Sequence, residues 1–313
     1  MEIIKNSFYV IAGLTRNLKN RIKRRLRIQS ATRGVKAAMT NRQTLIHLSK
    51  KLSDFESWQV FSFVTELSKY EYLIKADEKT NDNHIAEMQK IVNRREKGEP
   101  LYYIFGECEF YSLKFFVGEG VLIPRPETEL LVDTVIDLCK RRENIRVLDL
   151  CSGSGAVAIA IEKNIENCGI IAVEKCEKAY SWLSNNIEMH CSKVCPVCAD
   201  VFTYIPETKY DIIVSNPPYI KSYEIESLQK EVQREPQMAL DGGETGLLVY
   251  NEILSRYKNY LNENGIIALE IGYDQKVRVE EIFKQENFTD ITIKKDYNGH
   301  HRVIYGTVNT LQM

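Results

Sequence analysis

The stretch VLDLCSGSGAVAIA, residues 147–160, decides the fold because it joins a short apolar strand to a helix through a glycine-rich turn. Gly153 and Gly155 lack a Cβ atom, so the backbone can turn tightly there and approach a ligand at the start of the helix. Asp149, near the end of the strand, suits an amino group or a bound water better than a pyrophosphate. Turns of this kind bind many ligands, so the strands that follow must identify this one.

Apolar strands alternate with helical stretches from Arg146 to the end of the chain. The expected strands before the last pair are RVLDL, GIIAVE, VCPVCAD, YDIIVSN and GIIALEIG. This alternation predicts a parallel sheet covered by helices on both faces. The last two strands, ITIKKDY and RVIYGTV, are separated only by NGHH, which favours an antiparallel hairpin at the sheet edge. The sequence therefore predicts an α/β fold with a Rossmann-like sheet of seven strands.

The segment before this sheet is different in kind. Residues 41–97 carry apolar side chains at three- and four-residue spacings without proline, which predicts a small N-terminal helical bundle. Gly98-Glu99-Pro100 interrupts the pattern, and the aromatic stretch LYYIFGECEFYSLKFFV is typical of a hairpin. The predicted divisions are a basic extension at 1–38, a helical substrate-recognition domain at 39–98, a β-hairpin linker at 99–125 and a catalytic domain at 126–313.

The charge is divided unevenly along the chain. Residues 1–38 carry ten Lys or Arg and one acid, whereas the rest carries 32 Lys or Arg and 42 Asp or Glu, a balance of −10. An acidic body argues against binding nucleic acid mainly through its phosphates. The basic segment resembles a mitochondrial transit peptide. We favour instead a start codon assigned too early, with Met39 as the true start; a basic arm for RNA is a third reading.

Eight cysteines are scattered through the chain without a secretory signal, which predicts reduced thiols in the cytoplasm. No apolar stretch approaches the roughly 20 residues that span a bilayer, so no membrane role is expected. Cys191, Cys195 and Cys198 match the CxxxCxxC spacing of radical S-adenosylmethionine enzymes. However, the last two lie on an expected strand whose successive side chains face opposite ways, so we predict no metal site.

Three consecutive strand ends each offer a polar group to one ligand. Glu174 ends the second strand about 20 residues beyond the glycines, where a carboxylate can accept hydrogen bonds from both hydroxyls of a ribose. Asp200 ends the third strand and can accept from an adenine amino group, with Val201 and Phe202 against the ring. This is the crevice in which open α/β sheets bind ligands, so a nucleoside is expected there.

The fourth strand ends in SNPPYI, residues 215–220. Neither proline has a backbone N–H, so the strand stops at a rigid lip next to the nucleoside site. The side-chain oxygen of Asn216 and the backbone oxygen of Pro217 can each accept one N–H of a planar NH2 group. A glutamine amide and the amino group of adenine or cytosine both meet this description.

Further motifs carry a resemblance to a known family. They are VLIPRPETELLV at 121–132, GEPLYYIFGECEFYSLKF, SNPPYI and the loop EVQREPQMALDGGETGL at 231–247. With them, residues 41–310 resemble the class I S-adenosylmethionine-dependent methyltransferases. More closely, the chain is similar to the protein-(glutamine-N5) methyltransferases that modify peptide-chain release factors.

The resemblance implies methyl transfer from S-adenosyl-L-methionine to the side-chain amide nitrogen of the glutamine in the GGQ motif of release factors. It implies a cytoplasmic protein with release factors as partners, no membrane and no direct nucleic-acid binding. The expected cofactor-binding residues are Asp149, Cys151, Ser152, Gly153, Ser154, Gly155, Glu174, Asp200, Val201, Phe202 and Asn216. The expected catalytic residues are Asn216, Pro217 and Tyr219, and the same three with Pro218 are expected to bind substrate.

Three positions depart from the family pattern: Cys151 stands where the family usually has glycine, Glu174 where it usually has Asp, and Val201 at a position that can be aromatic. These departures bear on the affinity for the cofactor. Two alternatives remain: a DNA amino-methyltransferase acting on adenine N6 or cytosine N4, and a catalytically silent cofactor-binding protein. Arg125, Glu127 and Glu129 can contact cofactor or substrate, or serve only as a helix start.

Overall fold

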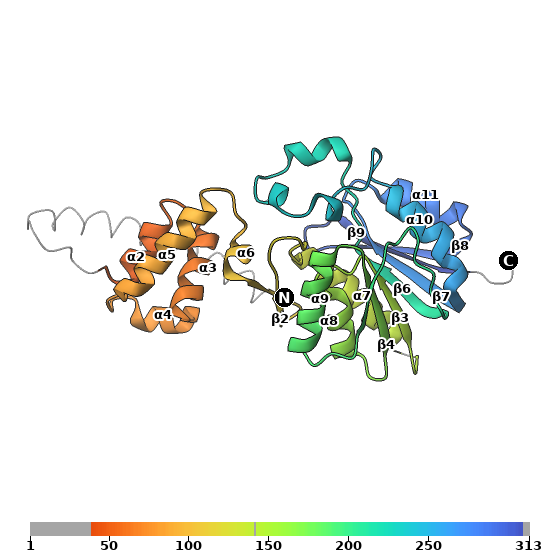
Figure 1. Ribbon diagram of the computed structural model, residues 1–313, viewed down its shortest axis with the longest axis horizontal. Helices are drawn as coiled ribbons and strands as arrows, with labels where there is room; N and C mark the ends of the chain where they lie inside the picture. The colour runs from red at the N-terminus through yellow and green to blue at the C-terminus, as the bar shows by residue number, and fades with distance from the viewer. Residues whose placement is uncertain (1–38, 141, 309–313) are drawn as a thin grey trace, which may run out of the picture.

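The computed structural model describes residues 39–140 and 142–308, and Figure 1 shows its helical N-terminal part beside a large α/β domain. The interpretations of residues 1–38 fall outside the described residues. No helix among the described residues is long and apolar enough to cross a membrane.

The N-terminal part is a helical bundle, as predicted. Its helices are α2 (Asn41–Leu48), α3 (Asp54–Thr65), α4 (Lys69–Lys75), α5 (Asp82–Arg95) and the short α6 (Leu101–Phe105). Thr40, Ser53 and Ser68 each begin a helix with a capping box, in which the side chain and the residue three positions on satisfy each other's backbone N–H groups. The bundle has its own buried core, which includes Val60, Phe61, Met88 and Val92.

A hairpin connects the bundle to the α/β domain. Strands β1 (Glu107–Phe110) and β2 (Leu113–Phe116) pair antiparallel across Tyr111 and Ser112, which both have positive φ, as tight hairpin turns require. Residues 101–105 are helical, although the sequence reading places them in the hairpin. Pro100 stands at the N-cap of α6, and Gly106 ends it at φ 77°.

The α/β domain contains the seven-stranded sheet that the sequence predicts. Its strands are β3 (Arg146–Leu150), β4 (Gly169–Glu174), β5 (Cys195–Cys198), β6 (Tyr210–Ser215), β7 (Leu261–Glu270), β8 (Phe288–Lys295) and β9 (His301–Val308). Their order is β5-β4-β3-β6-β7-β9-β8. The first five are parallel, whereas β9 runs antiparallel between β7 and β8. The edge hairpin is therefore confirmed.

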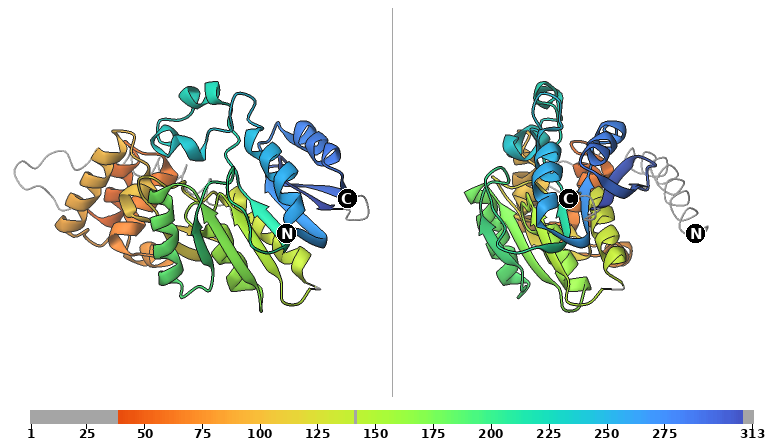
Figure 2. Two further views of the ribbon diagram at one scale, coloured as in Figure 1. Left: turned by 45° about the vertical axis from the view of Figure 1, so that its right-hand side comes forward. Right: turned by 90° about the vertical axis from the view of Figure 1, so that its right-hand side faces the viewer.

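Helices cover both faces of this sheet (Figure 2). On one face α7 (Glu129–Cys139), α8 (Ala156–Asn164) and α9 (Glu177–Met189) enclose a core with Val147 and Ile212. On the other, α10 (Leu248–Tyr257) and α11 (Lys276–Gln285) pack on their chain neighbours Leu148 and Ile213. Alternate side chains of the strands thus point into two cores, which explains their continuous apolar sequences.

The loop between β6 and α10 returns to the helical bundle, and Figures 1 and 2 show it arching from the sheet toward those helices. It contains three 3-10 turns: η2 (Ser222–Ser227), η3 (Val232–Arg234) and η4 (Gln237–Ala239). Arg95 of α5 binds Glu231 in this loop at 2.6 Å. The segment that follows NPPY is therefore fastened to the N-terminal helices.

Candidate active site

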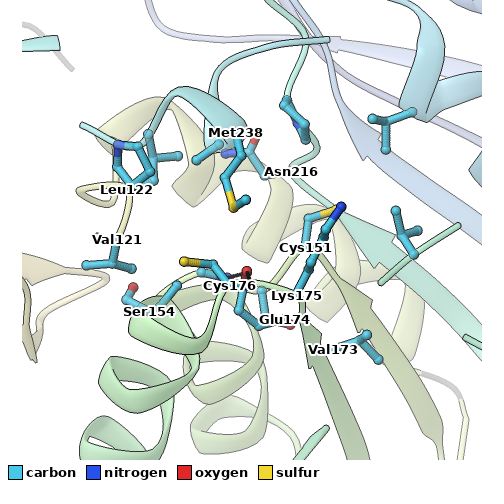
Figure 3. A pocket seen from close by; sticks show the side chains of 18 of the residues that line it. Val121, Leu122, Cys151, Ser154, Val173, Glu174, Lys175, Cys176, Asn216 and Met238 are labelled. Atoms are coloured by element: carbon cyan, nitrogen blue, oxygen red, sulfur yellow. Dashed lines mark hydrogen bonds between the residues drawn. The ribbon is translucent and has the colours of Figure 1, made fainter. Parts of the chain in front are cut away.

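A cavity of about 410 Å³ lies at the carboxyl ends of β3, β4 and β6 and beside the segment after β5 (Figure 3). The predicted site residues that line it are Asp149, Cys151, Ser152, Gly153, Ser154, Glu174, Asp200, Val201, Phe202, Asn216 and Pro218. Gly155, Pro217 and Tyr219 are not among its lining residues. One pocket thus brings together the expected nucleoside site and most of the NPPY motif.

The glycine-rich turn forms the floor of the cavity. Cys151 and Gly153 both have positive φ, at 59° and 56°, so the cysteine adopts a conformation that favours glycine. The Ser152 N–H donates to the carbonyl of Val173 at 3.0 Å, which ties the turn to β4. Gly155, at φ 80°, is the N-cap of α8, and a Cβ there would lie 2.4 Å from Cδ1 of Leu183. A side chain at this position would therefore collide with α9.

Asp149 presents a buried acceptor to the cavity. Its side chain is 1% exposed, and Oδ2 has no hydrogen-bond partner among the described residues. Burial raises the pKa of this carboxyl to about 7, against hydrogen bonding from Ser152. A buried carboxylate without a partner is costly. The site thus fits a ligand that brings an ammonium group or an ordered water to this point.

Glu174 is already held by two backbone donors. Its Oε2 accepts from the N–H of Gly153 at 2.8 Å, and its Oε1 accepts from the N–H of Cys176 at 2.7 Å. Burial raises the pKa of Glu174, although these N–H groups oppose the change. Each carboxylate oxygen can accept a second hydrogen bond, so the acid stays available to ribose hydroxyls.

Asp200 is paired across two strand ends with Lys175, a residue that the sequence reading did not single out. The Lys175 Nζ lies 2.7 Å from Oδ2 of Asp200, and the N–H of Phe202 donates to Oδ1 at 3.0 Å. Burial raises the pKa of Asp200, but Lys175 and the Phe202 N–H outweigh it and lower the pKa overall. The carboxylate therefore stays ionised beside the predicted adenine position.

The NPPY motif divides between the cavity and the protein behind it. Asn216 donates from Nδ2 to the hydroxyl of Thr128 at 3.2 Å. Tyr219 instead donates its hydroxyl to Glu270 at 3.3 Å, and its carbonyl accepts from Gln275 at 2.9 Å. The tyrosine therefore supports the motif from outside the cavity.

The PRPETE segment has mixed roles. Arg125 lines the cavity and forms an ion pair with Glu235, which is 5% exposed and also accepts from the N–H of Ile123 at 2.9 Å. Glu129 accepts from the N–H of Tyr111 at 2.7 Å, so it fastens the hairpin to α7. Thr128 lines the cavity, but no local pattern distinguished it from its neighbours.

The rim is apolar. Met238 and Leu248 line the cavity and are about half exposed, at 51% and 53%. Figure 3 shows Met238 and Asn216 on one side of the cavity and Glu174 on the other. Cys191, Cys195 and Cys198 lie elsewhere, exposed on and before the edge strand β5. The described part of the chain contains no group of three or more His, Cys, Asp or Glu that could hold a metal ion.

The chain matches two family models: the PrmC N-terminal domain over residues 43–106 and the methyltransferase small domain over residues 126–279. It is 40% identical over 253 residues to the release factor glutamine methyltransferase of Thermodesulfovibrio yellowstonii, covering 80% of this chain and 90% of that one. The enzyme of the same name from Fusobacterium nucleatum subsp. nucleatum is 41% identical over 251 residues, covering 78% and 70%.

Among solved structures, the hMettl16 catalytic domain in complex with an RNA hairpin is similar in fold, with a TM-score of 0.52 and 13% identity over 72% of this chain and 82% of that one. This likeness concerns the fold alone. The two sequence relatives cover most of both chains at 40% identity or more, and they agree with the resemblance stated above. The chain belongs to the family of release factor glutamine methyltransferases.

Proposed function

We propose that this protein transfers a methyl group from S-adenosyl-L-methionine to N5, the side-chain amide nitrogen, of the glutamine in the GGQ motif of peptide-chain release factors. The observation that carries the proposal is a single cavity, lined both by the strand-end residues expected to bind the cofactor and by Asn216. Both named relatives are release factor glutamine methyltransferases.

The cofactor end of the cavity would be held by three acids from successive strands. Asp149 would receive the amino group or its water, Glu174 the ribose hydroxyls and Asp200 the adenine amino group. S-adenosyl-L-methionine supplies an electrophilic methyl group on a sulfonium ion. The carboxylates of Glu174 and Asp200 are both held in place before the cofactor arrives, by backbone N–H groups and, for Asp200, by Lys175. Binding therefore need not order them.

The substrate end would position an amide nitrogen, a poor nucleophile because its lone pair is delocalised into the carbonyl. Nδ2 of Asn216 is directed at Thr128, and its Oδ1, which accepts no hydrogen bond from the described residues, can accept one substrate N–H. We assign the second N–H to the carbonyl of Pro217. Fixing the NH2 group in this way contributes through proximity, which supplies roughly 7–11 kcal/mol in favourable cases. Pro218 lines the wall, while Tyr219 stabilises the motif from behind.

The domains divide the work between recognition and chemistry. We propose residues 39–98 as the substrate-recognition domain, 99–125 as the linker and 126–313 as the catalytic domain. The separate core of the helical bundle supports this division, and the Arg95–Glu231 ion pair connects the bundle to the loop that carries Met238. The release factor would contact the bundle and the apolar rim together. The free thiols suit the cytoplasm, and the acidic body disfavours direct nucleic-acid binding.

Peptide mass spectrometry tests the reaction directly. A bacterial release factor would be incubated with this protein and S-adenosyl-L-methionine, beside an Asn216→Ala control and a DNA counter-substrate. We expect one methyl group on the glutamine of the Gly-Gly-Gln loop, and none with the variant. Methylation of the DNA instead, or of neither substrate, would contradict the proposal.

A further inference from the structure

The side-chain amide of Asn216 is oriented by a hydrogen bond to Thr128. Its Nδ2 donates to Oγ1 of Thr128 at 3.2 Å, and both residues line the cavity. Thr128 ends the 3-10 turn η1 (Pro126–Thr128), 88 positions earlier in the chain. Asn216 follows β6 directly. The contact therefore joins the PRPETE segment to the NPPY motif at the point where substrate is expected.

Thr128 is itself rigidly placed. Its side chain is 4% exposed, its N–H donates to the carbonyl of Arg125 at 3.0 Å, and α7 begins at the next residue. A hydroxyl on such a support loses little freedom when it binds a neighbour. The Thr128 hydroxyl is thus a fixed group that can orient the Asn216 side chain.

The carboxyl of Glu270 lies at the end of β7, the strand beside β6. Ser215 and Leu269 are register partners of β6 and β7, so Asn216 and Glu270 leave neighbouring strands together. Glu270 is 2% exposed. Its Oε1 accepts a hydrogen bond from the Tyr219 hydroxyl at 3.3 Å, whereas its Oε2 has no hydrogen-bond partner among residues 39–140 and 142–308. Glu270 thus keeps an unused acceptor beside the strand end that carries Asn216.

The direction of the hydrogen bond between Asn216 and Thr128 determines which group of the Asn216 amide faces the substrate. Because Nδ2 of Asn216 donates to Oγ1 of Thr128, the threonine oxygen is the acceptor and its own O–H points away from Asn216. The Asn216 amide then has its NH2 occupied and its Oδ1 toward the cavity. The reverse orientation would present a donor to the substrate NH2 group, and two donors repel.

We propose that Thr128 is a positioning residue for methyl transfer, holding the Asn216 amide with its oxygen toward the substrate. This inference rests on the proposed function, since it concerns the glutamine NH2 group. Thr128 need not touch the cofactor or the substrate to act in this way.

The test compares Thr128→Val, Thr128→Ser and a matched control, Thr134→Val, on the full chain. Thr134 is also fully buried, and its hydroxyl only donates to the carbonyl of Leu130 within α7. For each variant, kcat and KM for the release factor are measured at saturating S-adenosyl-L-methionine, and the Kd for the cofactor is measured by calorimetry.

We expect Thr128→Val to lower kcat by about 10- to 100-fold with KM and cofactor Kd within about twofold of the parent, as expected for misplacement of a reacting group. Thr128→Ser should restore most of the rate, and Thr134→Val should leave it unchanged. Parental kcat in Thr128→Val, a parallel loss of cofactor binding, or no rescue by serine would each overturn the inference. An unmodified release factor with the parent protein would instead overturn the proposed function, and the inference with it.

Discussion

The carboxylate of Glu174 at the end of β4 accepts a hydrogen bond from the backbone N–H of Gly153 in the turn after β3, at 2.8 Å. The contact fixes both the carboxylate and the glycine-rich turn before any ligand binds. The longer side chain of glutamate, where the family usually has aspartate, folds back far enough to reach both Gly153 and Cys176. Binding and preorganisation thus depend on one residue.

The substitution Glu174→Ala should therefore weaken binding of the cofactor more than it slows methyl transfer. Charged hydrogen bonds contribute about 1.5–3 kcal/mol each, so the Kd for S-adenosyl-L-methionine should rise by at least about tenfold. The kcat at saturating cofactor should change much less. Calorimetry and steady-state kinetics measure the two quantities, with exposed Glu177→Ala as control. Parental affinity in Glu174→Ala would contradict the assignment.

Asn216→Ala should have the opposite effect. The variant loses the acceptor proposed for the substrate amide, so methyl transfer should fall by at least about 100-fold, as for the removal of other transition-state contacts. The Kd for the cofactor should stay within about threefold. Asn251→Ala, an exposed asparagine on α10, is the matched control. Equal losses of cofactor binding and rate would show that Asn216 is not specific to substrate.

Gly155 offers a test of packing beneath the cofactor turn. Gly155→Ala places a Cβ 2.4 Å from Leu183 at φ 80°, whereas Gly299→Ala has nearly the same φ, 83°, with nothing within 4 Å. The backbone cost of about 1–2 kcal/mol should be shared by both variants. Only Gly155→Ala should add about 1–3 kcal/mol from overpacking, measured by denaturant unfolding. Equal stability of the two variants would exclude the contact with α9 as the reason for glycine.

The ion pair between Arg95 and Glu231 should stabilise the loop after NPPY. Arg95 also binds Glu56 at 2.8 Å, and its side chain is only 17% exposed. Arg95→Ala should lower the free energy of unfolding by about 1–2 kcal/mol and speed proteolysis within residues 222–242. Arg42→Ala, which removes a pair with highly exposed Asp77, should change stability by less than about 1 kcal/mol. Unchanged proteolysis of the loop in Arg95→Ala would argue against this anchor.

Glu270 makes stability depend on pH. Burial raises its pKa from 4.5 to about 7, against Thr128, Arg302 and Tyr219, and Glu127 raises it further. Tyr250 packs nearby and donates its hydroxyl to the Glu270 carbonyl. Between these two pH values the folded protein keeps a proton that the unfolded chain has released, so stability decreases as pH rises from about 4.5 to 7.

The variant Glu270→Gln cannot titrate at this position, so its free energy of unfolding should depend less on pH. Above pH 7 it should exceed the parent in the free energy of unfolding by up to about 3 kcal/mol, and near pH 4.5 the two should agree. Asp149 contributes in the same direction in both proteins. Denaturant unfolding at pH 5 and 8, with exposed Glu263→Gln as control, measures the difference. A variant whose profile parallels the parent's would show that Glu270 does not carry this dependence.

Much of the fold follows from local patterns. Strand β6 could be located from its β-branched run, and the prolines after it predict its end at Ser215, just before Asn216, because these effects act within a few residues. The same holds for the turn at Gly153 and for the acid at Glu174. Local capping chemistry could have separated α3 from α4, since Ser68 begins a capping box, although the apolar spacing continues across Glu66.

Strand order and side-chain direction were decided only by the tertiary structure. The position of β9 between β7 and β8 depends on pairing between distant segments, which no local pattern records. Thr128 and Glu270 lie beside the NPPY motif although they are far from it in sequence, and Tyr219 contacts Glu270 rather than the cavity. The amino-acid sequence by itself determined which chemical groups stand at the strand ends, because strand ends are set locally. Which of them face one another depends on long-range packing, because burial of both faces of the sheet fixes where each side chain points.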